Sequence, residues 1–307
     1  MGTYITRRIV QAAFTILGLT VAVFFVSRLS GDPASLLLSI YATPEDISRF
    51  RDVMGLNEPF HVQYANFLVH ALSGNFGTSF QYHAPALQLV VERLPATLLL
   101  AAAALAIAAL IGVLIGIVSA ARRDSWLDVC ISMFTLLGQS MPTFWLGIVL
   151  ITVFAVHLGL LPSSGYGSLQ QLVLPALTLA MYSAAGIARL TRASVLEALA
   201  QDYIRTARAK GLRERSVIGV HALKNAAIPI VTLVALQFAT LLGGAVIVEW
   251  IFAWPGIGRL AVQAVFTRDY PLVQAAVFVA AVGFVLINTA VDLLYRFLDP
   301  RIRVGAR

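Results

Sequence analysis

Residues 96–120 read ATLLLAAAALAIAALIGVLIGIVSA, without one charged side chain. About 20 consecutive apolar residues in an α-helix, at roughly 1.5 Å rise each, cross the hydrocarbon core of a bilayer, which is about 30 Å thick. The stretch lacks the polar–apolar alternation of a strand, and Leu, Ala, Val and Ile dominate it. Because only helices and closed barrels satisfy their backbone polar groups in lipid, the stretch predicts a transmembrane helix.

Five more apolar blocks flank this stretch, over residues 9–29, 129–156, 171–188, 228–248 and 272–297. The first block follows Arg7 and Arg8. It exceeds the roughly 7–15 apolar residues of a signal peptide core, so we interpret it as an uncleaved span. Pro142 and Pro175 lie within or near the starts of blocks, where neighbouring helices tolerate a kink. The pattern predicts an all-α integral membrane protein with six transmembrane helices.

The composition excludes an ordinary soluble domain. Hydrophobic residues make up 59% of the chain and charged residues only 12%, whereas soluble domains contain about 45–50% and about 25%. The formal net charge is +7, but no basic stretch is interleaved with aromatic residues, so we do not expect binding to nucleic acid. The single cysteine, Cys130, excludes an intramolecular disulfide and a metal site built from cysteines.

Lys and Arg residues gather in alternate connections between the blocks, the bias by which cytoplasmic loops are recognised. Most of the 22 basic residues fall on one side when the N-terminus is cytoplasmic, whereas the acidic residues divide almost evenly. We therefore predict that both termini are cytoplasmic. The domains expected are a cytoplasmic N-terminus with the first helix (1–29), a helical extracytoplasmic subdomain (30–95), a core with the other five helices (96–297) that includes a cytoplasmic connection (189–227), and a cytoplasmic tail (298–307).

The connection over residues 189–227 contains the most distinctive sequence, DYIRTARAKG at residues 202–211. Residues 193–210 lack Gly and Pro, and Gly211 follows Arg208 and Lys210, as at the C-terminus of a helix. A second helix is expected from Glu214 to Pro229, where the next span begins. This exposed amphipathic segment can lie on anionic lipid headgroups or dock in the groove of a partner protein. Its interspersed acidic residues and its glycine stop favour docking.

Residues 202–211, together with HALKNAAIP at 221–229, resemble the cytoplasmic signature of the ABC importer permeases of the dipeptide, oligopeptide and nickel family. Further matching stretches, in the same order along the chain, are GDP (31–33), GLNEP (55–59), GNFG (74–77), VEWIFAWPGIGRL (248–260), RDYP (268–271) and DPR (299–301). Each motif is weak alone, but the ordered set covers essentially the whole chain. The long first outer connection makes the chain similar to the first of two permease subunits.

The resemblance implies a type I ABC importer fold in the inner membrane, with the extracytoplasmic subdomain between helices 1 and 2. It implies a second permease subunit, two ATP-binding subunits that hold ATP and Mg, and an extracytoplasmic substrate-binding protein, with no cofactor in this chain. Peptides are the commonest substrates of the family, and relatives carry glutathione, nickel chelates or sugars. The residues implied to couple to the ATPase are Asp202, Tyr203, Ile204, Arg205, Thr206, Ala207, Arg208, Ala209, Lys210 and Gly211. Arg205 and Thr206 replace the Glu-Ala that opens the broader importer motif, whereas Ala207 and Gly211 match it.

Three kinds of chemistry have little support in the sequence. There is no Gly-x-x-x-x-Gly-Lys-Ser/Thr loop to cradle phosphates, so ATP hydrolysis is expected in another subunit. No histidine is expected within reach of Ser140 in its span, which argues against an intramembrane serine hydrolase. His61, His70 and His83 share the outer connection, but their spacings match no compact metal motif.

The remaining alternative is a channel or an ion-coupled secondary transporter that works without ATP. Such proteins place ionisable groups deep in their spans, and the predicted spans here are nearly free of charge. Gly112, Gly116, Gly243 and Gly244 allow close helix contact. The sequence leaves open whether these glycines serve a subunit interface, a moving gate or packing within this subunit.

Overall fold

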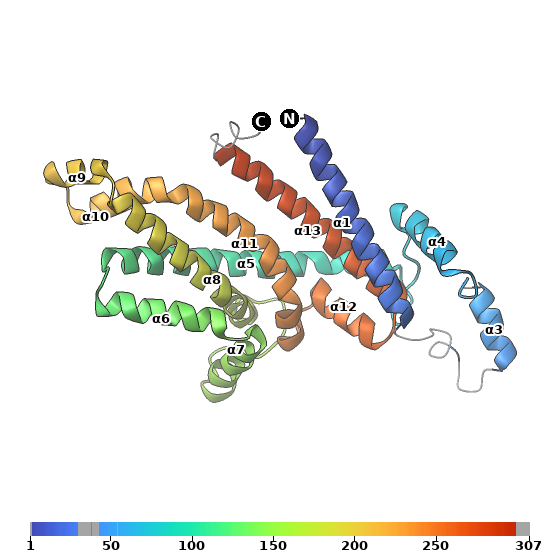
Figure 1. Ribbon diagram of the computed structural model, residues 1–307. Coiled ribbons are helices and arrows are strands. Elements are labelled where there is room, and N and C mark those ends of the chain that lie inside the picture. Colours follow the sequence, from blue (N-terminus) through green and yellow to red (C-terminus); the bar gives the residue numbers. More distant parts are fainter. Residues whose placement is uncertain (1, 30–37, 39–42, 54, 299–307) are drawn as a thin grey trace. The chain divides into compact units, whose positions relative to one another are not determined.

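A computed structural model describes residues 2–29, 38, 43–53 and 55–298. Within these residues the regular secondary structure is helical, apart from one isolated bridge between Thr78 and Pro85. The chain divides into two compact units, Met1–Ala96 with Pro255–Leu286, and Thr97–Trp254 with Ile287–Arg307. Helices α5 (Ala86–Ala121) and α13 (Tyr270–Leu298) contribute to both units (Figure 1).

The first unit contains α1 (Gly2–Leu29), α3 (Pro44–Val53), α4 (Phe60–Leu72), α12 (Ile257–Phe266) and parts of α5 and α13. Phe24 of α1 is fully buried, and its ring centroid lies 5.4 Å from that of Tyr64 in α4. The hydroxyl of Tyr64 lies 3.0 Å from Thr20 Oγ1, so one aromatic side chain joins the two helices by packing and by a hydrogen bond. Helices α3 and α4 fall in residues 30–95, and the extracytoplasmic location of that segment stays a prediction.

The RDYP motif anchors a loop of the same unit. Asp269 is fully buried, and its Oδ2 atom accepts hydrogen bonds from Ser79 Oγ (2.5 Å) and from the backbone amide of Gln81 (3.2 Å). Its Oδ1 atom accepts from the amide of Leu272 at the start of α13 (3.3 Å). A buried carboxylate without such donors is costly, so these bonds explain how an acidic residue is accommodated between the loop and the helix.

The second unit is built around α8 (Leu169–Leu199), which packs against α6 (Trp126–Ser140), α7 (Thr143–Leu150) and α11 (Leu223–Ile251). In the apolar window of α8, 61% of the residues are buried, compared with 22–33% in the other three long apolar helices. Ser168 caps the helix, accepting from the amide of Gln171, whose side chain accepts in turn from the amide of Ser168. Helix α8 is therefore the central helix of this unit.

Each of the six predicted apolar blocks coincides with a helix or a pair of helices. Four helices are long and apolar enough to cross a bilayer: Ala86–Ala121, Leu169–Leu199, Glu214–Ile251 and Tyr270–Val291. Within the described part of α1, Ala13–Phe25 forms a shorter apolar helix. The expectation of an all-helical membrane protein is confirmed.

The span predicted over residues 129–156, with a kink tolerated at Pro142, is bent sharply into two helices. Helix α6 ends at Ser140, and the next helix, α7 with the π-helical segment η1 (Ile151–His157), is inclined by 106°. Pro142 has no amide hydrogen to donate, and its ring disfavours the helical conformation for the residue before it. Accordingly, Met141 is extended, with ψ 126°.

The glycine pair of α5 packs within the subunit. A Cβ atom added at Gly112 would lie 2.8 Å from the carbonyl oxygen of Ala184, and one at Gly116 would lie 2.6 Å from that of Ala188. These distances leave no room for a side chain, so the two helix backbones touch. Of the alternatives that the sequence left open for this pair, the structure therefore shows packing against α8.

Candidate functional site

The predicted coupling segment folds as a short separate helix, α9 (Asp202–Ala209), beyond the end of α8 (Figure 1). The sequence predicted one helix over 193–210, but α8 ends at Leu199 and a turn at Ala200 and Gln201 redirects the chain. Asp202 lies in the first turn and Arg208 in the last turn, where each charge complements the helix dipole. The turn presents α9 as an element of its own.

Gly211 ends this helix, as the sequence predicted. Its φ is +75°, a conformation that residues with a Cβ atom adopt at a cost. The amide of Gly211 donates to the carbonyl of Arg208 (2.9 Å), and the amide of Leu212 donates to that of Ala207 (3.4 Å). The second bond is the long closing contact of a Schellman motif, which satisfies carbonyl groups that the helix end leaves unpaired.

One face of α9 is fixed to the unit and the other is exposed. Ile204 is fully buried and Ala207 is 6% exposed, and they pack in a cluster with Ala198, Val217 and Ala222. Tyr203 is 40% exposed, and the side chains of Asp202, Arg205, Thr206, Arg208, Ala209 and Lys210 are exposed as well. The helix thus presents a mixed polar surface on a rigid apolar base.

An ion pair closes the loop after α9. Arg208 Nη2 lies 2.6 Å from Glu214 Oε1 and Arg208 Nε lies 3.2 Å from Oε2, a two-point contact. The hydrogen bonds to Glu214 raise the pKa of the Arg208 guanidinium above its ordinary value. Both side chains are about half exposed, and exposed pairs contribute little stability. The pair therefore acts on the shape of the loop more than on its stability.

The chain returns to the next span without a break. Helix α10 (Glu214–Ser216) continues through the π-helical segment η2 (Val217–Ala222) into α11, and the combined helix extends over Glu214–Ile251. The expected restart at Pro229 is wrong, because Pro229 lies inside α11. In membrane helices the backbone groups that a proline frees are satisfied locally or by neighbouring helices.

A partly buried ion pair at the junction of α5, α6 and α8 was not predicted from the sequence. Arg192 Nε donates to Asp128 Oδ1 (2.8 Å) and Arg192 Nη2 to Asp128 Oδ2 (2.6 Å). The Asp128 side chain is 6% exposed. Asp128 directly precedes the apolar block at 129–156, and Arg192 lies in the predicted cytoplasmic connection over residues 189–227. An acidic residue at the edge of an apolar block was the available sign of a buried partner.

The described residues show no arrangement that supports the metal site or the serine hydrolase site considered from the sequence. Among the described residues, no three His, Cys, Asp or Glu side chains form a group that could hold a metal ion, and His61, His70 and His83 are exposed. The hydroxyl of Ser140 donates to the carbonyl of Leu136 in its own helix. Residues GDP (31–33) and DPR (299–301) lie outside the described part of the chain.

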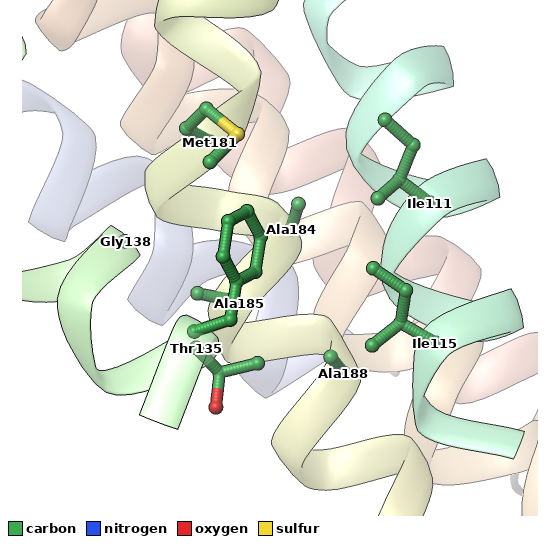
Figure 2. Close-up of a pocket in the computed structure, with 9 residues that line it drawn as sticks. Ile111, Ile115, Thr135, Gly138, Met181, Ala184, Ala185 and Ala188 are labelled. Carbon is green, nitrogen blue, oxygen red and sulfur yellow. The ribbon is translucent and has the colours of Figure 1, made fainter. Parts of the chain in front are cut away.

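A small hollow between α5, α6 and α8 is apolar (Figure 2). Ile111 and Ile115 face Met181, Ala184, Ala185 and Ala188 of α8 across it, with Gly138 of α6 at one side. The only polar group in its lining, the hydroxyl of Thr135, donates to the carbonyl of Ser132 in its own helix. The hollow therefore offers no group to recognise a polar solute.

Comparison with known proteins agrees with the motifs. The family described as "Binding-protein-dependent transport system inner membrane component" matches residues 112–304, and the N-terminal family of such membrane components matches residues 1–101. A protein of Brucella abortus (strain 2308), provisionally named a peptide transport system permease protein, is 42% identical over 99% of both chains. The glutathione transport system permease protein GsiC of Salmonella typhimurium (strain LT2) is 43% identical over 99% of both chains.

Two solved structures share the fold. An inward-facing structure of the MetNI methionine ABC transporter has a chain that superposes with a TM-score of 0.56 at 21% identity, over 69% of this chain and 97% of that one. A chain of an amino acid ABC transporter with histidines gives a TM-score of 0.52 at 20% identity, over 68% and 94% of the two chains. At this level of identity the similarity concerns the fold alone.

Proposed function

Because the chain belongs to the family of binding-protein-dependent transport system inner membrane components, we propose that it is the permease subunit of an ATP-driven importer of short peptides. The observation that supports the coupling mechanism is α9, a helix with a buried apolar base and an exposed polar face. The exposed face docks in a cleft of a separate ATP-binding subunit. The chain is a membrane component of a transport system and not an enzyme.

Coupling follows from how α9 is held. A force applied to Tyr203 or Thr206 is passed to Ile204 and Ala207 on the inner face, which pack against Ala198 at the end of α8. Packed interiors transmit such displacements because they are close-packed and stiff. When the ATP-binding subunits close, α9 and the helices that carry it move together, and access to the substrate path changes from one side of the membrane to the other.

The complete importer contains this chain, a second permease subunit, two ATP-binding subunits and an extracytoplasmic substrate-binding protein. The chain has no phosphate-binding loop, so ATP and Mg bind in the partner subunits. The distribution of Lys and Arg supports an inner-membrane orientation with both termini and residues 189–227 in the cytoplasm. Residues 30–95 then form the extracytoplasmic subdomain, the core extends over 96–297, and the tail 298–307 lies outside the described residues.

The substrate class rests on the relatives. The Brucella protein is named for peptide transport and the Salmonella protein for glutathione transport, and both match along 99% of the chain. Glutathione is itself a short peptide derivative. A short peptide delivered by the binding protein is therefore the substrate that the two names share.

Purification of the tagged chain from its native membrane in mild detergent tests the proposal. An ATP-binding subunit should accompany the unmodified chain and should be lost with Tyr203→Ala, which removes an exposed ring from the docking face. The matched control is Tyr82→Ala, because Tyr82 is similarly exposed (38% against 40%) but lies in the segment predicted to be extracytoplasmic. If the chain is recovered alone under all mild conditions, the importer function is wrong, and a channel or ion-coupled carrier takes its place.

A further inference from the structure

The Asp128 carboxylate connects three helices at one point. It accepts hydrogen bonds from the Arg192 side chain of α8, from the Ser119 hydroxyl of α5, and from the backbone amide of Asp124 in the turn before α6 (3.1 Å). Each of its two oxygens thus receives two bonds. Asp128 itself lies in the first turn of α6, where Ser125 caps the helix by accepting from the Asp128 amide.

Net stability is a weak explanation for such a pair. The Asp128 side chain is 6% exposed and the Arg192 side chain 33% exposed. Removing the carboxylate and part of the guanidinium from water costs energy that their attraction only partly returns, and well-packed apolar substitutes often stabilise a protein as well. What an apolar substitute cannot reproduce is the geometry. The planar guanidinium fork meets the carboxylate at two points and therefore fixes the direction of both side chains.

Arg192 lies near the end of α8, among residues that pack closely against neighbouring helices. Arg192 lies about two helical turns before the end of α8, which is followed by the turn into α9. Next to it, Thr191 is fully buried, and its Cβ would lie 2.6 Å from a Cβ added at Gly116 of α5. Val195, three residues after Arg192, is fully buried in a cluster with Ala226 of α11. The last turns of α8 are thus held on several sides.

We propose that Arg192 and Asp128 form a positioning lock that fixes the last turns of α8, and with them α9, to α5 and α6. Close packing at Thr191 and Val195 excludes separation of the helices, and the ion pair excludes rotation of α8 about its axis. A rotation by one residue, about 100°, would carry Arg192 away from Asp128. The inference rests on the proposed coupling role of α9, because it says how movement of α9 reaches the membrane helices as movement of one rigid body.

The test measures distances between two spin labels in the purified protein. The labels are attached to cysteines introduced by Trp126→Cys and Arg213→Cys. Trp126, at the start of α6, is 73% exposed, and Arg213, after α9, is exposed as well. The single native cysteine, Cys130, is changed to Ser. The distance distribution is recorded for the chain alone and for the assembled importer, without nucleotide and after trapping with Mg-ATP and vanadate.

With the native pair, one narrow distribution should persist in every state, since the labelled elements move together. Arg192→Met should widen the distribution about twofold and should add a shift on trapping, because Met makes neither of the two contacts to Asp128 and no longer holds α8 against rotation. Arg192→Lys keeps the charge without the fork and should fall between the two. The double variant Asp128→Leu with Arg192→Met leaves neither charge without its partner, so it should fold even where the single variants do not. It should widen the distribution as well.

The matched control is Arg189→Met, which removes an exposed arginine from the same helix and should leave the distribution unchanged. The lock is refuted if the folded Arg192→Met and double variants give the native distribution in every state. This result differs from failure of the proposed function, in which no ATP-binding subunit assembles with the unmodified chain. The chain alone still reports on the lock in that case.

Discussion

Replacement of Gly211 by residues of increasing backbone restriction should uncouple ATP hydrolysis from uptake in a graded way. Gly211 has φ +75°, and a Cβ atom added there would meet nothing within 4 Å. Any effect therefore arises from the backbone conformation and not from a steric clash with another part of the chain. This separation of causes makes Gly211 a clean position at which to test the coupling helix.

The magnitude follows from the cost of the left-handed conformation. A residue with a Cβ atom loses about 1–2 kcal/mol there, and Asn loses less because its side chain bonds locally. Val is β-branched, so its cost is at the upper end or above. About 1.4 kcal/mol is a tenfold change in an equilibrium constant. A cost of about 2 kcal/mol for Val therefore lowers the ratio of the native helix end to a helix end without the left-handed turn roughly 30-fold. Asn should remain close to the native protein, and Ala should lie between.

The assay reconstitutes the importer in vesicles and measures ATP hydrolysis and uptake at equal incorporation of the permease. Uptake per ATP should decrease in the order Gly, Asn, Ala, Val at position 211. Gly18→Val is the control, because Gly18 also has open space around an added Cβ but no positive φ. Equal uptake per ATP across the series, at equal incorporation, would refute the role of the Gly211 turn in coupling.

Three further changes follow from the same contacts. Ile204→Asp buries a charge without a partner in the apolar base of α9. Trypsin should therefore cleave the segment at least about tenfold faster, and the ATP-binding subunit should be lost on purification. An unchanged rate of cleavage would contradict the packing of Ile204. Arg208→Ala removes a half-exposed pair that contributes less than about 1 kcal/mol, so the melting temperature in detergent should fall by no more than about 2–4 °C, whereas a larger fall would assign the pair a larger role in stability. Gly116→Leu cannot fit where an added Cβ lies 2.6 Å from a carbonyl oxygen, so the melting temperature in detergent should fall by several degrees, whereas Gly243→Leu, with open space around its Cβ, should leave it unchanged.

The sequence predicted the helices well because the bilayer imposes one strong rule. A segment that is apolar over about 20 residues has few alternatives to a spanning helix. The rule does not predict whether a proline breaks a helix. Pro95, Pro175 and Pro229 lie inside continuous helices, whereas the chain at Pro142 turns by 106°. The residue type is the same in all four, so the outcome depends on whether neighbouring helices hold the two halves in line, which no local pattern reveals.

The candidate site was predictable in part, for a related reason. The glycine at 211 and the charges around it are local signals, and they predicted where the short helix ends. The turn at Ala200 and Gln201 contains neither Gly nor Pro, so the split between α8 and α9 had no local signal. The contact between Asp128 and Arg192 joins residues far apart in the chain, and its existence depends on how α6 and α8 pack. Propensity and patterning do not encode such pairings.

Exchanging residues of α9 with those of a related importer should have different effects on its exposed face and on its buried face. Arg205 and Thr206 are exposed, and they stand where the broader importer motif has Glu-Ala, so they are expected to decide which ATP-binding subunit docks. Ile204 and Ala207 are buried and are expected to transmit the movement of α9 whichever partner is bound. Replacing the exposed residues of α9 with those of a related importer should therefore transfer the ATP-binding partner while uptake per ATP is retained. Replacing the buried residues should keep the partner and lose uptake. Competition between the two ATP-binding subunits for the purified chain, followed by uptake at equal incorporation, separates these outcomes, and loss of both properties from either exchange would show that α9 responds as one undivided surface.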